Sequence, residues 1–200
     1  MKEYTDISLR HLDFSDNFFD LVQAVLEENI KQGNRTVSIQ SPTNTQKELE
    51  DEYRRQTRWS DNRVLIPVLF NFFHGIELFL KGIKYLNNDP VLQTKIRPSH
   101  KLSDLLKEFK SNYPEKNSLI EILDYYIFPK NKCEILSDFF KTNNINDSSA
   151  FFDVFKYPSN KDFKKQYDFK DLRRNGEKGI ELFERIIKDI EKLRDEKRNF

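Results

Sequence analysis

Residues 63–86 read RVLIPVLFNFFHGIELFLKGIKYL, and this segment decides the fold. It is apolar on almost every side, which predicts a helix buried in the middle of a helical bundle. His74, Glu77 and Lys81 interrupt the apolar pattern, and at about 100° per residue they fall within roughly 60° of one another. Buried ionisable groups are normally paired, and the i, i+4 spacing of Glu77 and Lys81 permits an ion pair. We therefore expect one polar stripe on the central helix.

The composition indicates a single all-α domain. The chain of 200 residues is long enough to bury a core without disulfides or metals, and its 5 glycines and 7 prolines are few for a sheet with many tight turns. The only cysteine, Cys133, cannot form a disulfide within the chain, and no secretory signal precedes the first helical pattern, so we expect a reduced, cytoplasmic protein. The charged residues within 63–86 favour a soluble protein over a membrane-spanning one. A net charge of +1 argues against a large, uniformly basic surface for nucleic acid.

The first helix is predicted over residues 16–32. Ser15 is a suitable N-cap, Phe14 and Phe19 have the spacing of a hydrophobic staple, and Gly33 is a suitable terminator. The apolar positions expected on its buried face are Phe18, Leu21, Val22, Val25 and Leu26.

Turn residues and apolar periodicity predict the remaining elements. Ser99 is a suitable N-cap for a helix that ends before Pro114, and Ser118 with Glu121 has the spacing of a capping box for a helix that stops at Pro129. We further expect a loop over 34–44 with a short strand at 36–40, a charged solvated helix within 45–59, a helix over 132–141 and a long final helix over 171–197.

The motif HGIELFLKGI, residues 74–83, followed by Ser99-His100-Lys101-Leu102, resembles the HEPN superfamily. HEPN domains are helical bundles whose long central helix often carries Glu-x-x-x-Lys, and the next helix begins with Ser or Thr, then His, any residue and Leu. The segment 155–158, Phe-Lys-Tyr-Pro, is similar to an aromatic-Tyr-Pro segment of many members. The resemblance covers residues 60–197 and leaves a helix and a charged extension over 1–59. It implies one HEPN-like, up-and-down bundle over 1–200, with a long buried central helix and a long C-terminal helix.

The HEPN resemblance implies several functions, and one sequence feature separates them. Members include toxin and phage-defence ribonucleases, partners of small nucleotidyltransferases, and binding modules, and many form homodimers that share a cleft. HEPN ribonucleases carry Arg, four to six residues, and then His on a late helix. Here the histidines stand at 11, 74 and 100. Arg97 is too close to His100, and Arg63 is too far from His74, so the usual ribonuclease motif is missing.

The polar stripe supplies the candidate pocket residues. Glu77, Lys81 and His100 are predicted to organise a pocket or dimer cleft for a phosphate, a nucleotide or a protein carboxylate, and the alternative is a purely structural ion pair. The further candidates for this pocket are Asn71, His74 and Arg97, and Lys84 extends the stripe beyond Lys81.

The second candidate site is the basic region 156–178. Its 8 Lys and Arg against 4 Asp and Glu give a net charge of 8 − 4 = +4. The aromatic residues Phe163, Tyr167 and Phe169 could stack on unpaired bases. The cations proposed to hold nucleic acid are Lys164, Lys165, Arg173 and Arg174. The alternative is a solvated loop.

These observations lead to one functional hypothesis and its alternatives. No second His or Cys is placed to complete a zinc set, and no phosphate-cradling glycine loop occurs, so we expect neither a metal nor a cofactor. The first hypothesis is a HEPN-like binding protein in bacterial or phage-related defence or in a toxin–antitoxin pair, forming a homodimer and binding a protein partner or RNA. The alternatives are an unorthodox metal-independent ribonuclease that uses His100 or His74, and a partner of a nucleotidyltransferase. Whether the protein is an enzyme stays open.

Overall fold

The computed structural model describes residues 2–35, 45–86, 99–145, 151–159, 162 and 164–200. The helices among them are α1 (Lys2–Gln32), α2 (Gln46–Gln56), α3 (Asp61–Leu86), α5 (Leu102–Asn112), α6 (Asn117–Ile127), α7 (Glu134–Asn143), α8 (Phe151–Lys156), the 3₁₀ helix η2 (Lys170–Leu172) and α9 (Gly176–Lys197). Over the described residues the only β-pairing is an isolated antiparallel bridge between Ser159 and Gln166. The predicted all-α class is therefore confirmed.

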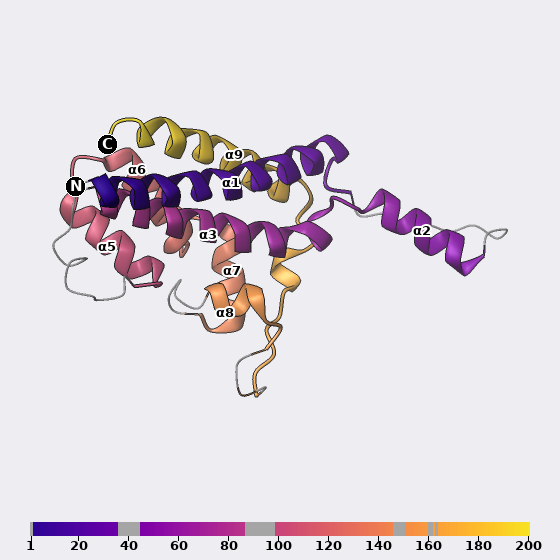
Figure 1. The fold of residues 1–200 in the computed structure, drawn as a ribbon. Coiled ribbons are helices and arrows are strands. Elements are labelled where there is room, and N and C mark those ends of the chain that lie inside the picture. The colour runs from indigo at the N-terminus through magenta and orange to yellow at the C-terminus, as the bar shows by residue number, and fades with distance from the viewer. Residues whose placement is uncertain (1, 36–44, 87–98, 146–150, 160–161, 163) are drawn as a thin grey trace.

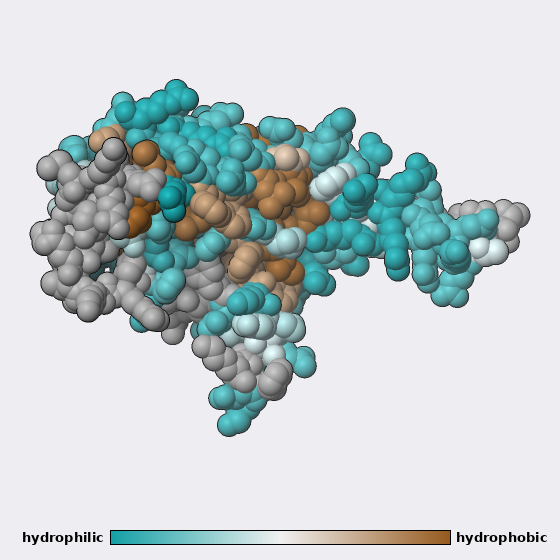
Figure 2. Space-filling model, in the orientation of Figure 1, coloured by the Kyte–Doolittle hydropathy of each residue, from teal (hydrophilic) through white to brown (hydrophobic). Residues whose placement is uncertain are grey.

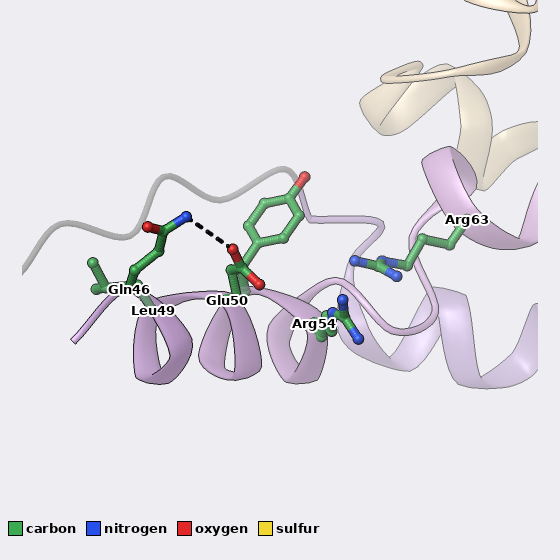
Figure 3. Close-up of a pocket in the computed structure, with 6 residues that line it drawn as sticks. Gln46, Leu49, Glu50, Arg54 and Arg63 are labelled. Carbon is green, nitrogen blue, oxygen red and sulfur yellow. Dashed lines mark hydrogen bonds between the residues drawn. The ribbon is translucent and has the colours of Figure 1, made fainter. Parts of the chain in front are cut away.

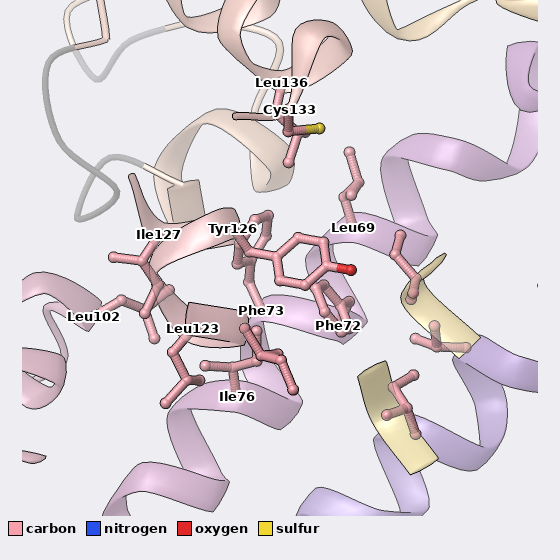
Figure 4. Packing of buried hydrophobic residues seen from close by; sticks show 14 of the residues in the cluster. Leu69, Phe72, Phe73, Ile76, Leu102, Leu123, Tyr126, Ile127, Cys133 and Leu136 are labelled. Carbon is pink, nitrogen blue, oxygen red and sulfur yellow. The ribbon is translucent and has the colours of Figure 1, made fainter. Parts of the chain in front are cut away.

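The long helices α1, α3 and α9 lie side by side and form the body of the bundle (Figure 1). α5 and α6 cover one end of α3, whereas α7 and α8 pack below its other half (Figure 1). The buried residues of α3 cover most of the circumference of the helix, whereas the face that carries Pro67, Phe70, His74 and Leu78 is exposed or partly buried. Figure 4 shows Phe72, Phe73 and Ile76 of α3 facing Leu123 and Tyr126 of α6. The other helices thus cover most of the central helix.

A close antiparallel contact joins α1 to α3. The hydroxyl of Ser8 donates to the carbonyl oxygen of Gly82, and that of Ser15 donates to the carbonyl oxygen of Gly75, each at 2.8 Å. An added Cβ would lie 2.6 Å from Phe19 Cε1 at Gly75, and 2.6 Å from Leu12 Cγ at Gly82. Gly75 and Gly82 have no side chains, and this absence leaves the space that Phe19 and Leu12 of α1 occupy.

Several predicted helix boundaries are wrong, and α1 shows the clearest reason. It begins at Lys2, so Ser15 is an interior residue bound to α3 and not an N-cap. Phe14 is 59% exposed whereas Phe19 is buried, which rules out the staple. Leu21 is 50% exposed and is not on the buried face. The end of α1 at Gln32 agrees with the prediction, and Gly33 has the left-handed φ of +73° that favours glycine there.

The caps predicted for later helices also differ. α5 begins after Lys101, and the Ser99 hydroxyl accepts the Lys101 N–H and contacts Asp104 Oδ2. α6 begins after Lys116 without a side-chain cap, so the Ser118 box is wrong. The final helix starts at Gly176 and not at 171, where the short η2 takes the place of the first turn. The strand predicted at 36–40 lies outside the described residues.

α2 projects from the bundle, and none of its residues is buried (Figure 1). Its start has a complete capping box, in which Thr45 and Glu48 each bond to the other's backbone N–H. At its base the Arg63 guanidinium lies 5.7 Å from the centroid of the Tyr53 ring. A shallow hollow of about 340 Å³ runs along this face (Figure 3), lined by Gln46, Leu49, Glu50, Tyr53, Arg54 and Arg63. The predicted charged, solvated helix is confirmed.

Asp61, the first residue of α3, binds the residue Asn34 that follows the end of α1 and the backbone that precedes α9. Its backbone N–H donates to Asn34 Oδ1 at 2.8 Å, and its carboxylate accepts the Asn34 side-chain amide at 3.2 Å. The carboxylate also accepts the backbone N–H groups of Arg174 at 3.0 Å and Asn175 at 2.7 Å. Asp61 is 2% exposed, and these donors replace the water that it loses.

Among the described helices, α3 is long and apolar enough to cross a membrane by length and composition. Other helices cover it, and 61% of its most apolar window is buried inside the bundle. The core helix of a soluble protein has the same properties, so the structure is compatible with a soluble protein.

Candidate functional site: a glutamate that joins two histidines and a lysine

The polar stripe of α3 converges with His100 on one carboxylate. Lys81 Nζ donates to Glu77 Oε1 at 2.6 Å, and His100 Nδ1 lies 2.8 Å from the same oxygen. The other oxygen, Glu77 Oε2, lies 3.3 Å from His74 Nδ1. His74, Glu77 and Lys81 share one side of α3, whereas His100 comes from the two residues that precede α5. Four of the six predicted pocket residues are therefore brought together.

The cluster is buried at its centre and open at its rim. The side chains of Glu77 and Lys81 are 4% and 7% exposed, those of His74 and His100 are 33% and 79% exposed. The buried ion pair is thus bordered by two imidazoles that solvent can reach. The cluster can therefore meet a partner or ligand through its histidines.

The protonation of Glu77 follows from its neighbours. Burial acts to raise its pKa, but hydrogen bonds from His74, Lys81 and His100 together with the Lys81 charge outweigh that effect and lower the pKa to about 2. Glu77 is thus a carboxylate at neutral pH. Lys81 Nζ also lies 3.1 Å from His100 Nδ1, but the contact of that nitrogen to Glu77 is shorter. We therefore assign the Nδ1 proton of His100 to the bond with Glu77, which leaves Nε2 as an acceptor.

The other residues predicted for this pocket have different positions. The Asn71 side chain donates to the Pro67 carbonyl oxygen at 2.7 Å and stays within its own helix. Lys84 pairs with Glu108 of α5 at 2.6 Å, so it links two helices and is not in the cluster. Arg97 lies outside the described residues.

An exposed apolar face adjoins the cluster. Phe14, Phe18, Leu21 and Val25 follow a 4-3-4 spacing on α1, and Phe14 and Leu21 are 59% and 50% exposed. His74 connects this face to the cluster, because its ring centroid is 4.6 Å from that of Phe18 in an edge-on contact. Figure 2 shows a band of apolar surface over α1 and α3. We define the α1 face as these four residues. The sequence predicted Phe18, Leu21 and Val25 on the buried face, but Leu21 is exposed and Phe18 and Val25 are only partly buried. The heptad spacing was a usable signal for this face.

The predicted cations of the basic region 156–178 have different contacts. Lys165 donates to the Asn143 carbonyl oxygen, which ties it to the end of α7, and Lys164 is exposed. Arg173 and Arg174 are exposed and line a hollow beside the start of α3. Lys165 Nζ lies 5.8 Å from the centroid of the Tyr167 ring, which lines the same hollow, so Lys165 adjoins the two arginines. Phe163 lies outside the described residues.

Within the described residues, no three His, Cys, Asp or Glu side chains are placed to hold a metal ion. The Cys133 thiol is buried, and burial raises its pKa. No protein-family model, curated protein or solved structure matches this chain.

Proposed function

We propose that the chain is a HEPN-like binding module that forms a homodimer through the α1 face, with the Glu77 cluster at the edge of the interface. The observation that carries this proposal is the position of His74, which contacts Phe18 of the α1 face and Glu77 of the cluster. The order of the HEPN-like motifs supports the family, and their residues Glu77, Lys81 and His100 are in contact. By the same resemblance, we propose a cytoplasmic protein of bacterial or phage-related defence.

A second copy of the chain is the partner that the α1 face fits best. Positions 14, 18, 21 and 25 follow the heptad spacing by which helices pack against one another along their length. The α1 face runs along about 17 Å of the helix at about 1.5 Å per residue. It continues onto His74 and Phe70 of α3, whose ring centroids are 6.3 Å apart. A stable dimer buries about 800 Å² per partner, so the interface must extend beyond the four residues of the α1 face. A two-fold axis across α1 would place the same apolar residues on both sides.

We expect the protein to be a dimer in solution and Phe14→Ser/Leu21→Ser to be a monomer. Both side chains are exposed in the single chain, so their replacement leaves the core intact. The matched control is Phe128→Ser/Tyr157→Ser, which removes two exposed apolar side chains elsewhere on the molecule. Sedimentation velocity measures the mass of each. A monomeric wild type, or a dimer that survives the α1 substitutions, would reject the proposal.

The histidine geometry favours metal-independent RNA cleavage as the second candidate. Both imidazoles contact Glu77 through Nδ1, and a neutral imidazole that donates from Nδ1 can accept a proton at Nε2. This activity predicts RNA cleavage in EDTA that is lost in His74→Ala and in His100→Ala. Cleavage that persists in the double variant would identify a contaminating nuclease and remove the candidate.

A further inference from the structure

A second concave site lies about the first turn of α3, beside the segment that leads into α9. It is a hollow of about 630 Å³, and its charged lining consists of Lys170, Arg173 and Arg174 against Asp168. The net charge of these four side chains is 3 − 1 = +2. Asp168 pairs with Lys170 at 3.5 Å, but both groups are exposed and the pair is weak. The hollow therefore favours an anion.

Arg173 and Arg174 are the arginines of this hollow, and Arg173 is close enough to Asp168 for its charge to help lower the pKa of that carboxyl group, after the larger effect of the Lys170 backbone hydrogen bond. Both residues are exposed, and neither guanidinium makes a hydrogen bond within the described part of the chain. Their position is fixed by the backbone, because Asp61 accepts the N–H groups of Arg174 and Asn175. Arg174 has a left-handed φ of +60°, which turns the chain at this point. Planar guanidinium groups suit phosphate oxygens, which they can bind with two parallel hydrogen bonds.

The uncharged residues that line the hollow supply aromatic rings and side-chain amides, which are the groups that bind a nucleotide base. Tyr167 and Phe169 contribute partly buried aromatic rings, and Phe169 is held in place by the Phe139 ring at a centroid distance of 5.5 Å. Asn62 and Gln166 add side-chain amides, which can both donate to and accept from a base edge. The volume falls within the range of about 300–1,000 Å³ for small-ligand sites.

We propose that this hollow binds a nucleotide, with its phosphate on Arg173 and Arg174 and its base against Tyr167. The site is separate from the Glu77 cluster and does not depend on the function proposed there. A free nucleotide and one unit of a single-stranded nucleic acid present the same chemistry, and titrations with both kinds of probe distinguish them. An acidic protein segment offers carboxylates without a base.

The test measures binding of ATP, UTP and a fluorescent oligouridylate of about ten nucleotides by the intact chain. The variant Arg173→Ala/Arg174→Asn is expected to weaken binding about tenfold, because two phosphate contacts are lost. Asn is chosen at 174 because it tolerates positive φ. Tyr167→Leu keeps an apolar side chain and is expected to lose about fivefold or more through base stacking. The matched control is Lys188→Ala/Lys192→Ala, which removes two exposed cations of α9. Lys188, the nearer of the two, lies roughly 18 Å along the helix from its first residue.

The probe that binds identifies the source of the nucleotide. Saturable ATP or UTP binding that competes with the oligonucleotide identifies a free nucleotide. A single strand is identified if the oligonucleotide binds more tightly than the free nucleotides. In that case the slope of log affinity against log salt concentration should be about −2 for the wild type and about −0.7 for the arginine variant. The proposal is overturned if no probe binds at about 1 mM, or if the lysine control loses as much affinity as the arginine variant. It is also overturned if polyglutamate competes with the nucleotide probes as well as they compete with one another and Tyr167→Leu has no effect on binding. Thermal unfolding of each variant verifies that it is folded.

Discussion

Replacing Glu77 with alanine is expected to lower the free energy of unfolding by about 3–5 kcal/mol, because the Lys81 ammonium would stay buried without its counter-charge. Lys81 is 7% exposed, and Glu77 is its ion-pair partner at 2.6 Å. The loss exceeds that of a surface pair, which is typically about 0–1 kcal/mol. Urea unfolding followed by circular dichroism at neutral pH measures the difference.

The double substitution Glu77→Met/Lys81→Met separates stability from function. Two apolar side chains of similar length can replace a buried ion pair at little cost, so its stability is expected to stay within about 1–2 kcal/mol of the wild type. The cluster would nevertheless lose the carboxylate that holds both imidazoles. A partner or RNA that depends on the cluster should no longer bind or be cleaved. Unchanged function in a stable double variant would show that the cluster is only structural.

Acid should reduce the contribution of Glu77 in a defined pH range. Its folded-state pKa is about 2, below the ordinary value of 4.5, so the ionised group stabilises the fold fully above pH 4.5. That contribution, about 3 kcal/mol for a difference of about 2.5 pKa units, is lost as the pH falls from 4.5 through 2. The wild type should therefore lose more stability than Glu77→Met/Lys81→Met over this range. Parallel loss in both proteins would contradict the assigned pKa.

The second large effect is expected at the α1–α3 contact, where Gly75→Ala/Gly82→Ala should destabilise the fold by about 2–5 kcal/mol. Each added methyl group would lie 2.6 Å from a side-chain carbon of Phe19 or Leu12. Overpacking of this kind typically costs about 1–3 kcal/mol per site. Neither neighbour can move into solvent, because Phe19 and Leu12 are 1% and 4% exposed.

The sign of this effect distinguishes packing from helix propensity. In an exposed helix, glycine to alanine stabilises by about 1 kcal/mol, so a stabilised double variant would contradict the close contact. Ser8→Ala and Ser15→Ala provide the matched comparison, because each removes one hydroxyl from the same contact without adding volume. We expect about 1 kcal/mol for each of them. Thermal unfolding compares all three variants with the wild type.

Local patterns predicted the central helix and its polar stripe, but not the features that depend on distant residues. The apolar character of 63–86 and the spacing of Glu77 and Lys81 are properties of one helix, and they were sufficient. Ser15 was misassigned because a serine suits both an N-cap and a helix interior that meets a partner backbone. That choice depends on Gly75, which is 60 residues away. The convergence of His100 on Glu77 was expected from a family motif and not from local geometry.

The nucleotide hollow was the hardest feature to predict. The charge and the aromatic residues of 156–178 predicted Arg173, Arg174, Tyr167 and Phe169 as candidates, but not that they line one hollow. The position of Lys165 results from a bond to Asn143 that the sequence does not reveal. The contribution of Asn62 from the start of α3 had no signal in the sequence.

The hydrogen bonds between Asn34 and Asp61 affect which changes of sequence and length the fold can tolerate. Two hydrogen bonds hold Asn34 beside Asp61, so the end of α1 and the start of α3 meet at one point, and α2, which lies between them in the sequence, projects from the bundle (Figure 1). The helices on either side are held by α1–α3 packing, so their positions do not depend on what lies between. Doubling the length of a flexible loop costs only about 0.6 kcal/mol. Insertion, exchange or deletion of sequence in α2 is therefore expected to cost the fold little stability, because none of its residues is buried.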